Sequence, residues 1–137
     1  MLTAYARSQY QEMQVQTTPG KLVVMLYDGA LRFLHLGIEG LRQRDLEAQS
    51  LNLGKAQKIL CELQGTLDLN AGRIAYDLYA IYDYCLRRLL TANAEDREEY
   101  IQEVIQLLTV LRDAWDQAER NVRSGEGSAE GTLTAEG

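Results

Sequence analysis

The sequence predicts an all-α protein, an antiparallel four-helix bundle with a mobile N-terminal arm and a disordered C-terminal tail. The chain has a single Pro, and apolar residues recur at steps of three and four over long stretches separated by short polar links. Long helices joined by short links favour antiparallel neighbours. The 137 residues suffice for one domain with a core. We expect the arm over residues 1–17, the bundle over 18–123 and the tail over 124–137.

The first helix is expected to begin at "TTPGKL" and to continue to about Gln43. Thr18 suits the N-cap, and Pro19 suits the first helical position, where a missing N–H is harmless. Between residues 22 and 41 the polar side chains form one narrow stripe, and nearly all the rest is apolar or small. That is more apolar surface than one core-facing side requires. The glycines are predicted to be points of close helix packing: Gly29, Gly37 and Gly40.

The second helix is expected to start near Asp45, a suitable N-cap, and to end near Leu67, before "DLNAG" interrupts the pattern. Its apolar residues follow a single seam, because they recur at steps of three and four. The seam consists of Leu53, Ala56, Leu60, Leu63 and Leu67.

The third helix contains "IAYDLYAIYDYCLRRLL", residues 74–90, and is expected to reach Ala92. It carries two apolar stripes about 100° apart around the helix. One stripe consists of Ile74, Leu78, Ile81, Cys85 and Leu89. The other consists of Ala75, Tyr79, Tyr82, Leu86 and Leu90.

The fourth helix follows "NAEDREEY", whose acidic residues suit the positive end of a helix dipole, and is expected to end near Val122. Its seam is Ile101, Val104, Leu108, Leu111, Trp115 and Ala118. The remainder is Gly-rich and acidic, and it has too little apolar surface to offset the entropy of ordering.

Composition excludes several classes of function. The net charge of −6 argues against nucleic-acid binding and against docking on an anionic membrane. No apolar run is long enough to insert into a membrane, and the first residues lack the features of a secretory signal, so we expect a cytosolic protein. Cys61 and Cys85 are expected to be buried free thiols. The chain lacks the repeated Glu-x-x-His motifs of a di-iron bundle, and we expect no metal, no cofactor and no enzyme activity.

The one histidine, His35, admits an alternative. "HLGIEG" lies on a bundle helix, as does the exposed histidine of histidine phosphotransfer domains, whose motif is similar to H-x-L-K-G. Ile38 stands at the position of the lysine in that motif, and Glu39 follows it. An acidic neighbour such as Glu39 would repel a phosphate group. A solvated surface histidine is the simpler interpretation.

The surplus of apolar residues on the first and third helices predicts an exposed apolar groove. Large apolar patches on soluble proteins mark interaction sites, and tyrosine suits them because its hydroxyl stays hydrated. An amphipathic helix of a partner would fit such a groove. Homodimerisation could cover the same surface, so an obligate homo-oligomer remains an alternative.

Two segments resemble the FliS family of flagellin-specific export chaperones. "QVQTTPGKLVVMLYDGALRF" (residues 14–33) resembles the start of the family's bundle, and "AGRIAYDLYAIYDYCLRRLLTAN" (71–93) resembles its third helix. "LRDAWDQ" (111–117) is similar to the last helix. The likeness extends over about residues 4–121 in the same order.

The resemblance implies a cytosolic chaperone that binds the C-terminal region of flagellin, prevents premature polymerisation and aids type III export. It also implies contacts with flagellar regulatory or export proteins, and an N-terminal arm that lies over the client groove when no client is bound. For the arm we name Tyr10 and Val15. For the groove we name Met25, Leu26, Tyr27, Leu78, Tyr79, Ile81, Tyr82 and Leu86.

Overall fold

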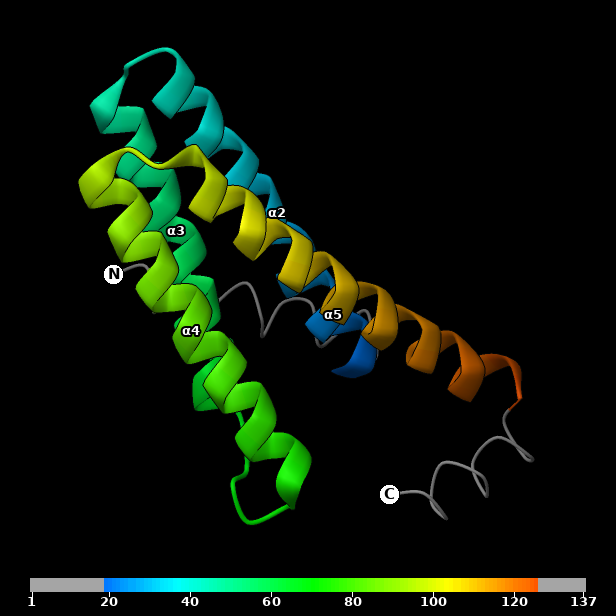
Figure 1. The fold of residues 1–137 in the computed structure, drawn as a ribbon. Coiled ribbons are helices and arrows are strands. Elements are labelled where there is room, and N and C mark those ends of the chain that lie inside the picture. The colour runs from blue at the N-terminus through cyan, green and yellow to red at the C-terminus, as the bar shows by residue number, and fades with distance from the viewer. Residues whose placement is uncertain (1–18, 126–137) are drawn as a thin grey trace.

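The computed structural model describes residues 19–125, and its described part consists of four helices and their connections (Figure 1). They are α2 (Pro19–Arg42), α3 (Leu46–Gly65), α4 (Arg73–Glu95) and α5 (Glu98–Ser124). The predicted all-α, four-helix architecture is confirmed. Each helix boundary lies within about three residues of its predicted position.

Several predictions fall outside the described residues. The predicted arm lies there, with Tyr10, Val15 and the Thr18 cap. Nearly all of the predicted tail lies there too, although its first residue, Ser124, is the last residue of α5.

Each helix packs against two neighbours. α2 contacts α3 and α5, and α4 contacts α3 and α5, so α2 and α4 are diagonal across the bundle. α3 and α4 run side by side in Figure 1, whereas α5 moves away from the N-terminal part of α4 and continues beside the start of α2. The bundle is therefore tighter at one end than at the other.

The helix ends follow from local chemistry. The side chain of Asp45 accepts a hydrogen bond of 3.0 Å from the backbone N–H of Ala48, which satisfies a free donor in the first turn of α3. Asp96 ends α4 with a left-handed φ of 55°, so that α5 can start at Glu98 with an acidic first turn. Gly72, with φ of 132°, occupies the position before α4 that a side chain would strain.

Two of the three glycines predicted to be packing points bring α2 very close to α3. A Cβ atom on Gly40 would lie 2.7 Å from the backbone nitrogen of Gln49. A Cβ atom on Gly37 would lie 2.7 Å from Cδ2 of Leu53. At Gly29 the same test gives an ordinary contact of 3.5 Å with Ile59.

The wide apolar side of α2 is used inside the fold. The buried residues of α2 are spread over the sides that face α3, the core and α5, because α2 packs against both α3 and α5. Packing inside the bundle therefore accounts for part of the apolar surplus on α2, whereas Met25 and Leu36 are each 38% exposed. The buried residues of α2 are Leu22, Val24, Tyr27, Ala30, Leu34, Gly37, Ile38 and Gly40.

Candidate partner-binding surface

One apolar stripe of α4 changes from exposed to buried along its length. Ile74 is 71% exposed, Leu78 and Ile81 are partly buried, and Cys85 and Leu89 are completely buried. All five lie on the same side of the helix, because they follow steps of three and four. The stripe thus begins outside the bundle and ends inside it.

The seam of α5 shows the opposite gradient along the chain. Ile101 and Leu108 are completely buried, Leu111 and Trp115 are partly buried, and Val122 is 41% exposed. Since α4 and α5 are antiparallel neighbours, the exposed ends of the two stripes belong to the same end of the bundle.

We call this end the open end and define it by six apolar residues. It is the region where α5 moves away from α4 in Figure 1, so that side chains turned toward the bundle axis stay partly in contact with solvent. Apolar surface of this kind is favourable to bury against a partner, at about 25 cal/mol per Å². The residues of the open end are Ile74, Leu78 and Ile81 on α4, and Leu111, Trp115 and Val122 on α5.

Two of the predicted groove residues lie in the core instead. Tyr27 is 0% exposed and Tyr82 is 2% exposed, and their hydroxyl groups share a hydrogen bond across the diagonal between α2 and α4. Their placement in an exposed groove was wrong. A buried tyrosine requires a partner for its hydroxyl, and these two tyrosines provide it for each other.

Burial also determines the ionisation of this pair. Desolvation, followed by the hydrogen bond that its hydroxyl shares with Tyr82, raises the pKa of Tyr27 far above its ordinary value of 10.0. Desolvation also raises the pKa of Tyr82. A tyrosine is already protonated at neutral pH, and burial extends the protonated state of these two to higher pH, so the pair forms a neutral polar contact inside an apolar core.

The other predicted groove residues are divided among three places. Leu78 and Ile81 lie at the open end. Tyr79 is 43% exposed, its backbone carbonyl accepts a hydrogen bond from the Gln64 amide of α3, and Leu86 lies on the same side of α4 as Tyr79. The remaining two are on α2: Met25, 38% exposed on the side away from the core, and Leu26, partly buried near α3.

Four residues of the open end were not predicted from the sequence to be surface residues. Ile74 was assigned to an apolar stripe without being selected, while Leu111 and Trp115 were assigned to the α5 seam. Val122 was expected only to end that helix. The sequence did contain a signal for their exposure. The apolar seam of α5 continues to Val122, and the first turns of α4 cannot cover a seam of that length.

A polar cluster joins the C-terminal half of α4 to the first turns of α5, near the buried residues Leu89 and Ile101 and away from the open end. Arg88 donates to Glu103 at 2.8 Å and to the Tyr84 hydroxyl at 3.0 Å, and Tyr84 in turn donates to Glu103. The hydrogen bond from Tyr84, and then that from Arg88, lowers the pKa of the Glu103 carboxyl. The Arg88 guanidinium also lies 4.0 Å from the centre of the Tyr100 ring. The cluster fixes the position from which the two helices diverge.

The histidine and the two cysteines lie on three different helices. Within residues 19–125 no three His, Cys, Asp or Glu side chains come together as metal ligands would. His35 is exposed on α2. Cys85 is buried, and desolvation raises the pKa of its thiol to about 12, whereas Cys61 is exposed, contrary to expectation. None of the helices in the described range has the length and apolarity needed to cross a bilayer.

Fold and surface together define a class: a small antiparallel helical bundle that leaves an apolar surface between two diverging helices. Comparison with known proteins specifies the class further. A family model described as flagellar protein FliS matches residues 1–122. The flagellar secretion chaperone FliS of Bacillus subtilis (strain 168) is 42% identical over 122 residues, which is 86% of this chain and 91% of the relative.

A second relative points to the same family, and a solved structure points to the same fold. The flagellar secretion chaperone FliS of Salmonella typhimurium is 36% identical over 118 residues, covering 85% of this chain and 87% of its own. A solved structure, described as a flagellar chaperone from bacteria, superposes with a TM-score of 0.71 over 78% of this chain and 88% of the other, at 21% identity. That structure supports the fold. The chain belongs to the FliS family of flagellar secretion chaperones, which confirms the resemblance drawn from its sequence.

Proposed function

We propose that this protein binds the C-terminal segment of flagellin in the cytosol, prevents its premature polymerisation and keeps it competent for export. The apolar surface of the open end carries the proposal. Ile74 is 71% exposed on the stripe that is completely buried at Cys85 and Leu89. Family membership supports flagellin as the partner, because the relatives bear the name of flagellar secretion chaperone.

An amphipathic segment of the client is the best match for this surface. An apolar helix face could contact α4 and α5 together, in the manner of a helix placed in a groove. Ile74, Leu78 and Ile81 follow helical spacing, so they present a continuous line of apolar contacts about two turns long. Tyr79 and Leu86 extend the apolar surface of α4 toward α3, and Met25 and Leu26 provide further contacts on α2.

A client that folds as it binds would form a releasable complex. Ordering a flexible segment offsets several kcal/mol of the gross gain when roughly 1,000–3,000 Å² is buried. An arm carrying Tyr10 and Val15 that competes for the same surface would weaken binding further. Flagellar regulatory or export proteins are further proposed partners.

Titration calorimetry with full-length flagellin and with flagellin lacking its C-terminal segment tests the proposal. We expect a one-to-one complex with the first and no detectable heat with the second. Equal binding of both forms would contradict it. Light scattering of the purified protein supplies the control, since a stable dimer without flagellin would favour the homo-oligomer alternative.

A further inference from the structure

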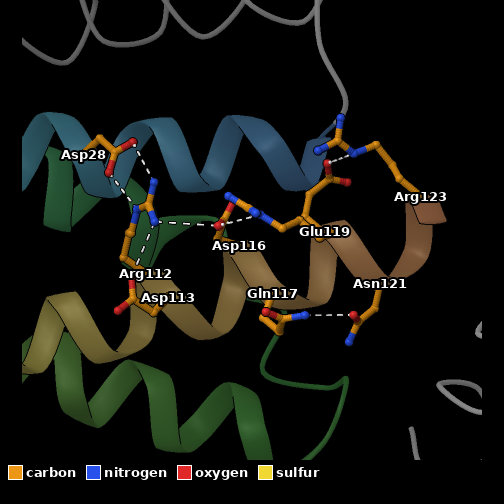
Figure 2. A network of polar contacts seen from close by, with 9 residues as sticks. Asp28, Arg112, Asp113, Asp116, Gln117, Glu119, Asn121 and Arg123 are labelled. Carbon is orange, nitrogen blue, oxygen red and sulfur yellow. Dashed lines mark hydrogen bonds and ion pairs between the residues drawn. The ribbon is translucent and has the colours of Figure 1, made fainter. Parts of the chain in front are cut away.

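The half of α5 that moves away from α4 stays attached to α2. Arg112 of α5 and Asp28 of α2 form two contacts, from Nε to Oδ1 at 2.8 Å and from Nη2 to Oδ2 at 3.5 Å (Figure 2). Two parallel contacts between a guanidinium and a carboxylate fix orientation as well as distance. Arg42 and Glu98 form a similar pair at the opposite end of the same two helices.

Neighbouring carboxylates hold Arg112 in place. Its Nη1 lies 3.4 Å from Oδ1 of Asp113 and 3.7 Å from Oδ2 of Asp116, and Asp116 also pairs with Arg120 at 3.0 Å. The other contacts in Figure 2 remain within α5, such as the pair between Arg123 and Glu119 at 2.9 Å. Among the ion pairs drawn in Figure 2, the pair between Asp28 and Arg112 therefore differs from the others, because it connects α5 to α2.

The position of Arg112 on α5 also sets the direction of its neighbours. Successive residues of a helix are about 100° apart, so when Arg112 faces α2, Leu111 faces α4. Trp115 lies between these two directions, toward the core. Attraction between the apolar residues of α4 and α5 favours closure of the open end, and a polar attachment to α2 opposes it.

We propose that Arg112, through its ion pair with Asp28, is a positioning residue that holds α5 on α2 and so keeps the open end available to a partner. The effect on the partner rests on the proposed function. The effect on α5 does not, because it concerns the free protein. Without the ion pair, α5 closes toward α4 and buries Trp115 and Leu111 against Ile74 and Leu78.

The test compares Arg112→Gln with Arg120→Gln. Both variants lose one positive charge from the C-terminal half of α5, but Arg120 pairs with Asp116 inside the helix. Trp115 is the one tryptophan of the chain, so its emission reports the position of α5 without any partner. We expect a blue shift in Arg112→Gln alone, with circular dichroism confirming that both variants remain helical.

Binding of a flagellin C-terminal peptide provides the second measurement. We expect Arg112→Gln to weaken it about two- to fivefold, the range of a partly exposed ion pair, and Arg120→Gln to leave it unchanged. Asp28→Asn should weaken it equally, and the double variant no further than either single one.

Three results would overturn the proposal: unchanged or red-shifted emission in Arg112→Gln, the same blue shift in Arg120→Gln, or equal loss of affinity in the two variants. If wild-type protein binds no flagellin peptide while the emission of Arg112→Gln still shifts, the positioning role holds and the proposed function fails.

Discussion

The two ends of the bundle are built from the same helices and differ in what covers their apolar stripes. At the end opposite the open end, which we call the closed end, Leu89 and Ile101 have no exposed surface. The amide of Gln49, only 1% exposed, donates to Asn93 at 2.9 Å and to Asp96 at 3.0 Å, connecting α3 to the turn between α4 and α5. At the open end the same stripes meet solvent, because α5 follows α2 instead of α4.

This difference divides one apolar stripe of α4 into an exposed part and a buried part. Cys85 and Leu89 belong to the core, whereas Ile74 is 71% exposed and Leu78 and Ile81 are partly buried. A helical stripe can therefore be continuous in sequence and still change in burial, according to whether a neighbouring helix accompanies it.

The largest expected effect is a difference in stability between two leucines of α4. Leu89→Ala should lower the free energy of unfolding by about 3–5 kcal/mol, since Leu89 is completely buried and its removal leaves a cavity. The same substitution at Leu78, which is partly buried, should lower it by about 1 kcal/mol. Chemical denaturation measures both. Equal losses would show that the open end is packed as tightly as the closed end.

The second effect concerns the hydroxyl pair that lies between the two ends. Tyr82→Phe should destabilise the protein by about 1–3 kcal/mol, because it removes the hydroxyl that shares a hydrogen bond with the buried hydroxyl of Tyr27. Tyr27→Phe combined with Tyr82→Phe should recover most of that loss, since no unpaired hydroxyl remains. Denaturation of the three variants tests the coupling. Additive losses would show that the two hydroxyls act independently.

A smaller and pH-dependent effect follows from the same pair. Burial raises the pKa of Tyr27 and Tyr82 above 10.0, so above that pH the unfolded chain releases protons that the folded chain retains. Stability should therefore fall as the pH rises above about 10. Absorbance at the tyrosinate band, followed beside circular dichroism, should show two tyrosines that ionise only when the helices unfold. Ionisation of both in the folded protein would contradict their burial.

Much of the fold could be predicted from sequence. Pro19 at the first helical position, the N-cap Asp45 and the break at Gly72 located helix boundaries, and steps of three and four identified which side of each helix packs. The candidate site was harder, because periodicity gives the direction of a side chain around a helix but not whether a neighbour covers it.

The tyrosines illustrate the limit. Tyr79 and Tyr82 belong to the same apolar stripe, yet Tyr79 is 43% exposed and Tyr82 is 2% exposed. Tyr82 packs in the core, where Tyr27, far away in sequence, offers a hydrogen-bond partner for its hydroxyl across the bundle. Such a pairing depends on the packing of diagonal helices, which no local pattern contains.

If the open end receives the partner, a charge placed there should weaken binding, and two matched substitutions compare this surface with another exposed apolar site. Ile74 and Val110 are 71% and 68% exposed, but Val110 lies on the side of α5 away from its buried seam. We expect Ile74→Asp to weaken binding of a flagellin C-terminal peptide at least about tenfold, which corresponds to about 1.4 kcal/mol. Val110→Asp should leave the affinity unchanged, and both variants should retain the wild-type melting temperature. Equal affinities for Ile74→Asp and wild type, with both proteins folded, would contradict the account.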